Sequence, residues 1–262
     1  RFTDKANYNK TEYFDEMQDR DYRLKQSIIS PWYTKITGGK ETNITPDFSV
    51  TLTGYQIIKW SLDDEKYEGV ENSNNSLPVF RLGEVLLNYA EAKAELEEMT
   101  TDIWNKTIKP LRERSGVNGR PPIEADPYLA KYYNIDDKWI LEVRRERAIE
   151  LLLEGFRYDD LMRWKLGHLL KNEWDGIYIP YLNQAQDLNK DGKNDFSVVT
   201  NSAGNEPGVY YLNLSTMTDY SLNEDNCLVY RNDVKWSDNK YLRPIPKNAL
   251  DINPDLGQNP GW

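Results

Sequence analysis

The sequence predicts a mainly α-helical protein with long loops and a few short strands. Helical periodicity is strong between residues 79 and 164 and fades afterwards. Hydrophobic residues make up only 39% of the 262 residues, and the mean hydropathy is −0.79, which indicates that much of the chain runs in polar loops. Short aromatic or β-branched runs alternate with polar turns from residue 171 onward. We expect residues 1–262 to form one domain.

The N-terminal part holds few regular signals. Residues 1–47 are polar and irregular, with a break at Gly38-Gly39, so we expect loop with short helical or extended pieces. Residues 48–60 are rich in β-branched and aromatic side chains, which predicts a short hairpin or a bulged strand. The acidic stretch 63–75 is expected to be a surface loop.

Residues 79–98 carry the first strong helical pattern. The larger apolar side chains near one stripe are Leu82, Leu86, Tyr89 and Leu96. Alanines supply a second face of small side chains, so we expect a helix buried on both sides. A second helix is expected over residues 102–114, kinked or shortened by Pro110. The two would form an antiparallel hairpin over residues 79–116, close to the ~34-residue unit of tetratricopeptide arrays. No second copy of this unit is visible at a fixed period, so the length match alone favours a fold class of tetratricopeptide-like helical hairpins.

The strongest helical segment runs from near Trp139 to Trp164, with Asp136 or Asp137 as its cap and an interruption at Gly155. Side chains of alternating charge stand three or four positions apart along it: Arg147, Glu150, Glu154 and Arg157, extended by Asp160 and Arg163. Two such carboxylates could serve as acid and base. The neighbouring arginines would keep them ionised, however, which is wrong for a general acid. We therefore predict a buried structural lattice of ion pairs.

Composition excludes several classes of site. Acidic residues outnumber basic ones by 43 to 33, a net charge of −10, which argues against nucleic acid as a partner. The single cysteine, Cys227, excludes an internal disulfide and a Cys-based zinc cage, and the single histidine, His168, excludes a His-rich metal site. Cys227 is expected to be a buried inert thiol. No apolar run is long enough to span a membrane, and Arg1 begins no secretory signal pattern.

Residues 187–195, DLNKDGKND, have the oxygen-ligand spacing of a calcium loop. The candidate metal ligands are Asp187, Asn189, Asp191 and Asp195. Gly192 permits the sharp turn, and Lys193 can offer its carbonyl oxygen. Val198 stands where such a loop carries a bidentate acid, so another ligand would have to complete the shell. The alternative is an ordinary turn rich in Asn, Asp and Gly.

Tyrosine and tryptophan dominate the aromatic residues, with 18 Tyr and 8 Trp against 6 Phe. Trp60, Trp104, Trp139 and Trp164 fall in regular segments and are expected to pack in the core. Trp32 and Trp174 lie in polar stretches, and Trp174 is followed by two tyrosines. Exposed rings of this kind stack on sugar faces. The candidate glycan-binding residues are therefore Trp32, Trp174, Tyr178 and Tyr181.

Several stretches together resemble one family. They are RLGEVLLNYAEAKAEL (81–96), PLRERSGV (110–117), RRERAIELLLEGFRYDDLMRWKLG (144–167), YLRPIPKNAL (241–250) and NPDLGQNPGW (253–262). In order and spacing they resemble the C-terminal half of a SusD/RagB-type outer-membrane nutrient-binding lipoprotein. The most specific part is the ERxxELxxEGxRxxDLxRW pattern from Glu146 to Trp164.

The resemblance implies a non-catalytic protein of the cell outer membrane, exposed at the surface, with a helical-repeat scaffold and ligand-facing loops. Such proteins capture glycans or other nutrients and cap a SusC-like TonB-dependent transporter. Family members are longer and begin with a lipidated cysteine, so we expect this chain to be a fragment without the N-terminal repeats. Any membrane attachment would then depend on a lipid anchor absent from this chain.

Two other classes of function compete with binding. An all-α glycoside hydrolase or lyase needs two carboxylates flanking a sugar cleft, and no pair free of neighbouring arginines stands out in the sequence. A helical repeat that only binds other proteins would not need the tyrosines and tryptophans in its loops.

Overall fold

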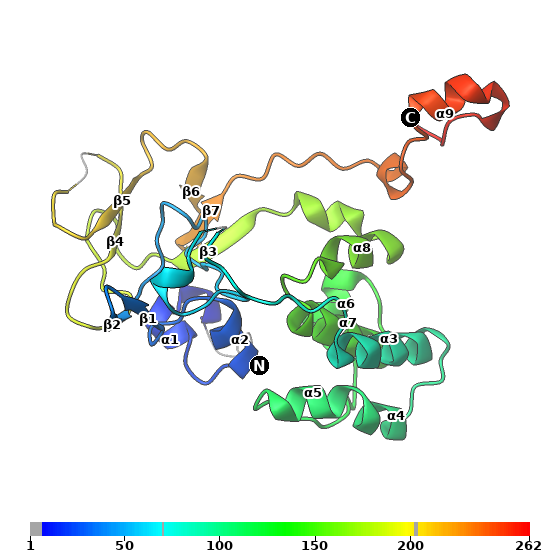
Figure 1. Ribbon diagram of the computed structural model, residues 1–262, viewed down its shortest axis with the longest axis horizontal. Coiled ribbons are helices and arrows are strands. Elements are labelled where there is room, and N and C mark those ends of the chain that lie inside the picture. The colour runs from blue at the N-terminus through cyan, green and yellow to red at the C-terminus, as the bar shows by residue number, and fades with distance from the viewer. Residues whose placement is uncertain (1–6, 70, 202–203) are drawn as a thin grey trace.

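Most of the helices lie apart from the strands in the computed structural model, which describes residues 7–69, 71–201 and 204–262 (Figure 1). The helical region contains α3 to α8, between residues 82 and 163. The strand region combines the elements before and after it in sequence, because the N-terminal segments pack with the later strands. A C-terminal arm, residues 231–262, first contacts the segment that follows the helical region, where the Gly167 amide donates to the Tyr241 hydroxyl at 3.0 Å, and its last part projects outward (Figure 1).

The elements follow in chain order. α1 (Tyr13–Glu16) and α2 (Tyr22–Ser27) precede β1 (Thr34–Thr37) and β2 (Lys40–Asn43). The helical region contains α3 (Leu82–Glu95), α4 (Thr101–Lys106), α5 (Ile108–Arg114), α6 (Pro127–Tyr133), α7 (Lys138–Glu150) and α8 (Phe156–Arg163). The later strands are β3 (Trp174–Tyr178), β4 (Phe196–Val199), β5 (Tyr210–Asn213), β6 (Tyr220–Leu222) and β7 (Cys227–Tyr230), and the arm carries α9 (Lys247–Ile252). None of the helices in the described ranges is long and apolar enough to cross a bilayer.

The strands of the described residues form three small sheets. β7 lies between β3 and β6 in an antiparallel sheet, and β4 pairs with β5 in parallel. β1 and β2 form a hairpin in which Thr37 faces Lys40. Between them Gly38 and Gly39 have φ of 58° and 74°, the left-handed conformation that a two-residue hairpin turn requires. The expected break at Gly38-Gly39 is therefore a hairpin turn, and the expectation of short extended pieces before residue 47 is confirmed for the described residues.

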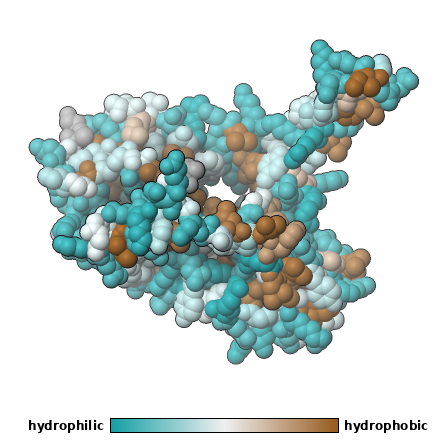
Figure 2. All heavy atoms as spheres, in the orientation of Figure 1, coloured by the Kyte–Doolittle hydropathy of each residue, from teal (hydrophilic) through white to brown (hydrophobic). Residues whose placement is uncertain are grey.

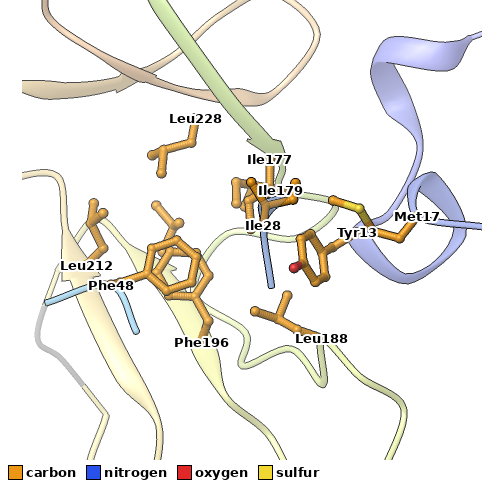
Figure 3. Close-up of a cluster of buried hydrophobic side chains, with 11 residues drawn as sticks. Tyr13, Met17, Ile28, Phe48, Ile177, Ile179, Leu188, Phe196, Leu212 and Leu228 are labelled. Carbon is orange, nitrogen blue, oxygen red and sulfur yellow. The ribbon is translucent and has the colours of Figure 1, made fainter. Parts of the chain in front are cut away.

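The strand region has its own hydrophobic core, drawn in Figure 3. Phe48 stacks on Phe196 of β4 with ring centroids 3.6 Å apart and planes 8° apart. Tyr13 of α1 and Ile177 of β3 are buried in the same cluster. Because this core joins residues far apart in the sequence, it fixes the N-terminal segment against the later strands.

Two further cores lie in the helical region, and they test the expected positions of four tryptophans. Trp104 is fully buried and donates from Nε1 to the carbonyl of Gly119 at 2.7 Å, which confirms its core position. Trp139 and Trp164 are partly buried against these cores. The core prediction is wrong for Trp60, which is 36% exposed. Its backbone has φ of 70°, which places it in a turn and not in a strand.

The predicted hairpin or bulged strand over residues 48–60 is wrong. The Asp47 carboxylate accepts a hydrogen bond from the amide of Ser49 at 2.8 Å, and the Asp47 carbonyl accepts one from Thr51 at 2.9 Å, so the segment begins with a turn. Side chains of this kind compete with regular structure for backbone donors. Within the segment only Ile57 forms a bridge, with Ile28.

The expectation that α3 is buried on both sides is also wrong. Its buried face carries Leu87, Ala90 and Glu91, whereas Leu82 and Tyr89 of the predicted stripe are exposed. Figure 2 shows apolar side chains gathered on the surface over the start of this helix. The physical reason is that Glu91 pairs with cations of the neighbouring helices, which turns an acidic residue toward the core.

The two long helices predicted from the sequence are each interrupted. The predicted helix 102–114 is divided at Thr107 into α4 and α5, three residues before the helix-breaking Pro110. Asp137 is the cap of α7 and accepts from two backbone amides at 2.8 Å each. α7 ends at Glu150, and α8 begins after Gly155, whose φ of 86° suits glycine. The sequence had suggested that the charged residues on either side of this break share one helix face. Because of the break they do not.

Candidate functional site

Charged side chains of α7 form a buried ion network with the surrounding elements. Glu146 accepts from Arg23 of α2 at 2.6 Å and from Arg112 of α5 at 2.7 Å. Arg147 donates from Nε and Nη2 to the two oxygens of Asp160, both at 3.0 Å. Such charge-assisted pairs hold helices in register. The predicted structural lattice is confirmed for Arg147 and Asp160, which are buried and paired across α7 and α8, whereas Glu146 was not among its predicted members.

Glu150 is the most heavily paired carboxylate of this network. Arg23, Arg81 and Arg114 all donate to its oxygens. Burial raises its pKa, but hydrogen bonds from Arg114, Arg81 and Arg23 outweigh burial and lower the pKa to about 2. A carboxylate of this kind stays ionised at neutral pH and has no proton to donate as a general acid.

The outer members of the predicted lattice behave differently. Glu154 binds Lys59 and Arg81, with Nζ of Lys59 at 2.7 Å from its Oε1. Arg157 donates to the hydroxyl of Tyr133 at 3.2 Å and lies over that ring. Arg157 therefore belongs with the aromatic core of α6, because the break at Gly155 turns it away from Glu150.

An aromatic stripe crosses the three-stranded sheet, formed by Trp174, Tyr230 and Tyr220. The sheet register places Tyr230 of β7 opposite both other residues, and cross-strand partners share a face. The rings of Trp174 and Tyr230 are stacked with centroids 5.9 Å apart and planes 27° apart. The rings of Tyr220 and Tyr230 meet edge to face at 5.1 Å.

Trp174 also borders an open cavity of about 320 Å³, whose other wall is the segment 50–57. Threonines 51 and 53 and Gln56 supply hydroxyl and amide groups there. Trp174 is 49% exposed. An indole face beside hydroxyl and amide groups is the combination that binds a sugar ring.

The other predicted ligand-binding residues do not join this stripe. Tyr178 is half-buried at the other end of β3. Tyr181 is exposed and lines a separate cavity of about 160 Å³ with Phe14. Trp32 packs edge to face on Phe14, at a centroid distance of 5.3 Å. Trp32 and Tyr181 therefore both lie near Phe14, and neither lines the cavity beside Trp174.

Sequence reasoning missed Phe14, Tyr220 and Tyr230. Tyr230 ends a run that was predicted to be extended, so its strand could be expected but its cross-strand partners could not. Trp174, expected in a polar loop, is the first residue of β3. The only signal for the stripe in the sequence is the excess of tyrosine and tryptophan over phenylalanine.

The predicted calcium loop folds as a tight turn beside the cavity that Tyr181 lines. The Asp187 carboxylate accepts from the amide of Gly192 at 2.7 Å, and Asp191 accepts from Lys193 at 2.9 Å. Asp195 accepts from the amide of Leu188 at 2.8 Å. Such bonds use one lone pair each and leave others on the same oxygens.

The carboxylates of this loop are close enough to influence one another. Burial, and then the charges of Asp187 and Asp191, raise the pKa of Asp195 against hydrogen bonds that lower it. A cation among these groups would relieve that repulsion. Within residues 7–69, 71–201 and 204–262, however, no group of three or more His, Cys, Asp or Glu side chains is arranged to hold a metal ion. The calcium site stays a prediction.

Neither of the two reactive side chains singled out by composition forms a catalytic group. Cys227 is buried and donates from Sγ to the carbonyl of Asn9 at 3.0 Å. Burial raises the pKa of this thiol to about 11, so it is protonated at neutral pH, as expected for an inert cysteine. His168 is exposed in the short 3-10 turn after α8.

Comparisons with known proteins agree on one family. The sequence model of the SusD family matches residues 1–262. The crystal structure of a SusD-like protein (BF3747) from Bacteroides fragilis NCTC 9343 is similar with a TM-score of 0.58 at 20% identity, over 94% of this chain and 39% of that protein. The structure of selenomethionine BT4246 is similar with a TM-score of 0.50 at 22% identity, over 81% of this chain and 30% of that protein. No curated protein sequence matches the chain.

The structural likeness at these identities concerns the fold alone. The chain spans about two fifths of the first protein and less of the second. The predicted mixture of helices, long loops and short strands agrees with the structure.

Proposed function

The chain belongs to the SusD family, and from this premise we propose that it binds glycans or related nutrients at the cell surface without changing them. The observation that carries the proposal is the stripe of Trp174, Tyr230 and Tyr220, with its half-exposed indole beside a cavity. Aromatic faces of this kind attract the C–H surface of a sugar, and the adjacent hydroxyl and amide groups can bind its hydroxyls.

Binding without turnover is supported by the state of the carboxylates. Retaining and inverting glycosidases both need a carboxylic acid that is protonated before catalysis. Glu150 has the opposite property, because arginines keep its pKa at about 2. Glu146 and Asp160 are likewise buried against guanidinium groups. A hydrolase or lyase is the competing hypothesis, and it would need an acid outside this network.

The partner, location and finer architecture are part of the same proposal. We propose delivery of the ligand to a SusC-like TonB-dependent transporter, at the outer membrane, with attachment through a lipid anchor. The helical region would serve as a tetratricopeptide-like scaffold that positions the strand region. Membership of the family supports these features. The helical region and the strand region also occupy different parts of the molecule (Figure 1).

The test is a binding measurement with a panel of neutral oligosaccharides. Trp174→Ala should weaken binding of a recognised glycan at least about tenfold, which is ~1.4 kcal/mol, without lowering the melting temperature. The matched control is Trp262→Ala, because Trp262 is 48% exposed but lies at the end of the arm. Equal losses in both variants would refute the stripe as the site.

Turnover is tested with the same protein and sugars. Reducing ends released from the oligosaccharide panel should stay at the background of a buffer control. If hydrolysis survives repurification and disappears when one carboxylate of the protein is replaced by its amide, the protein is an enzyme and not only a binding protein. Binding of protein partners with no glycan binding would favour the third class, a helical repeat for protein interaction.

A further inference from the structure

A third cavity, of about 410 Å³, opens between α2, α5, α7 and the segment 59–60. We propose that this cavity binds an acidic sugar unit through Arg114. It shares no lining residue with the cavity beside Trp174. The inference rests on the proposed function only for the choice of a sugar as the ligand.

The charges that line this cavity are mostly positive. Arg23, Lys59, Arg81 and Arg114 face two carboxylates, Glu150 and Glu154. Arg23 is neutralised further by Asp21 and Glu146, which lie behind it. With Asp21 and Glu146 included, four carboxylates balance the four cations, so the positive charge that a ligand meets depends on which cation is exposed.

Arg114 is the most exposed of the four cations that line this cavity. Its side chain is 55% exposed, against 10% for Arg23 and 21% for Arg81. It contacts Glu150 through Nη2 alone, at 2.6 and 2.7 Å. No hydrogen bond from its Nε or Nη1 reaches another residue that the structure describes, whereas all three nitrogens of Arg23 and of Arg81 are engaged.

Glu150 does not need Arg114 to remain satisfied. Arg23 donates to its Oε2 at 2.7 Å, and Arg81 donates to its Oε1. The Nε–H and Nη1–H groups of Arg114 point from different edges of the guanidinium, so each can donate a separate charge-assisted hydrogen bond to a carboxylate or sulfate oxygen. Arg114 can therefore bind a ligand while Glu150 stays paired.

Aromatic rings flank the accessible guanidinium. The ring of Tyr22 lies on the backbone of Gly116, where an added Cβ would come within 2.8 Å of it. The Tyr22 amide also donates to the carbonyl of Ser115 at 3.1 Å, which fixes α2 beside the end of α5. Tyr22 is therefore held next to Arg114 by backbone contacts, yet it is 58% exposed.

Trp60 also lines this cavity and has an uncommon backbone conformation. Its φ of 70° is rare for a bulky side chain. Nζ of Lys59 lies 5.3 Å from the indole centroid. Strained residues of this kind gather at ligand sites, and here the strained residue is an indole that lines the same cavity as Tyr22.

Two aromatic rims and a half-free guanidinium define the class of ligand. The rings can stack on the faces of a sugar, and the guanidinium can bind an anionic substituent on it. The shared chemistry is a sugar that carries one negative group, either the carboxylate of a uronic acid or a sulfate ester.

The experiment compares four probes by calorimetry at low and physiological salt: trigalacturonic acid, a carrageenan tetrasaccharide that carries sulfate, neutral galactotriose and free sodium sulfate. One or both acidic oligosaccharides should bind more tightly than galactotriose, and this preference should shrink with salt. Arg114→Gln should reduce the affinity for the preferred acidic probe at least about tenfold and leave the affinity for galactotriose unchanged.

Arg120→Gln is the matched control, because Arg120 is exposed just beyond α5 and does not line the cavity. Tyr22→Ala is a second variant in case Arg114→Gln fails to fold, and it should also reduce the affinity for the acidic probe. Equal affinities for acidic and neutral sugars, or equal losses in the Arg114 and Arg120 variants, would overturn the inference. Sulfate binding as strong as that of the acidic oligosaccharides would also overturn it, because the site would then bind an anion and not a sugar.

The outcomes separate this inference from the proposed function. If galactotriose or another neutral glycan binds in a Trp174-dependent manner while acidic probes show no preference, the proposed function stands and the second site fails. If no sugar binds to the wild-type protein at either salt concentration, both fail. If acidic probes bind in an Arg114-dependent manner and Trp174→Ala changes nothing, the second site stands and the stripe fails.

Discussion

The helical region and the strand region distribute their side chains in opposite ways. In the helical region charged groups are buried, as with Glu146 and Arg147 at 1% and 3% exposure, whereas Leu82 and Tyr89 face outward. In the strand region phenylalanine and isoleucine fill the core and Trp174 and Tyr181 are exposed. Both regions therefore depart from a simple rule in which charge lies outside and aromatic rings inside.

The contrast teaches how to distinguish scaffold from site in this protein. Buried charges that satisfy one another specify how helices pack and are unable to react with a ligand. An exposed ring on a sheet contributes little to the stability of the fold and remains accessible to a ligand. The most strongly patterned segment of the sequence, residues 139–164, is therefore scaffold, and the weakly patterned later strands carry the proposed site. The predictions below test this division.

The largest expected effect is the loss of stability in Glu150→Ala. This substitution removes the carboxylate that Arg23, Arg81 and Arg114 share, and breaking a buried ion pair by removing one partner costs about 3 kcal/mol or more. Chemical denaturation should show it as a shift in the midpoint. Glu113→Ala is the control, because that carboxylate on α5 is 56% exposed and the expected loss is within about 0.5 kcal/mol. An unchanged midpoint for Glu150→Ala would remove the structural role of the network.

Acid should weaken the helical region first. The pKa of Glu150 is lowered from 4.5 to about 2, so its stabilising effect is complete above pH 4.5 and is lost as the pH falls toward 2. Complete protonation removes about 3 kcal/mol. In the strand region burial raises the pKa of Asp195, so protonation of that group favours the folded state instead.

Hydrogen exchange between pH 6 and pH 2 measures this difference, after correction for the intrinsic exchange rate. Peptides from α7 should lose protection before peptides from β7. Glu150→Gln should flatten the pH dependence of the α7 peptides. If peptides of both regions lose protection together at every pH, the two regions unfold as one unit. They would then differ in the kinds of side chains they bury but not in stability.

Calcium should stabilise the strand region by an intermediate amount. Extracellular calcium loops have dissociation constants of about 10⁻⁴ to 10⁻³ M, and calcium at ten times that constant would add ~1.4 kcal/mol. Melting curves with calcium and with chelator would show the difference. Asp191→Asn should abolish it, while Asp233→Asn, an exposed carboxylate on the arm, should not. Coincident curves for the wild-type protein would identify residues 187–195 as an ordinary turn.

The helix cap of α7 should contribute about 1 kcal/mol. Asp137 accepts from the amides of Trp139 and Ile140, and replacing such a cap by alanine typically costs about that amount. Asp137→Ala should therefore lower the free energy of unfolding, and the neighbouring Asp136→Ala should not. Equal effects for the two variants would show that general charge at the helix N-terminus, and not the cap itself, stabilises α7.

The helices could largely be predicted from the sequence because their signals are local. Periodicity located α3 and α7, Asp137 was one of two proposed caps, and Gly155 marked the interruption before α8. The face that α3 buries could not be predicted, because it depends on Arg163, which pairs with Glu91 from another helix. Long-range pairing of this kind has no signature at helical spacing.

The candidate site was only partly predictable for the same reason. Trp174 could be proposed from its polar surroundings, but its stack on Tyr230 depends on the register between β3 and β7. The cavity beside Arg114 depends on three-dimensional contacts between α2, α5 and α7. In both places the residue types were visible in the sequence, and only the fold showed which of them lie together.

The smallest expected effect on stability is that of Trp174→Ala, and it is the sharpest test of the comparison. Because this indole is half-exposed and stacks on one tyrosine, its removal should cost at most about 0.5 kcal/mol of unfolding free energy. Phe196→Ala in the same region is the matched control: that ring is fully buried against Phe48, and its loss should cost about 3 to 5 kcal/mol. Denaturation curves for the two variants should therefore separate widely. If Trp174→Ala destabilises the protein as much as Phe196→Ala does, its ring is part of the core, and the strand region loses the accessible aromatic face on which its proposed role in binding depends.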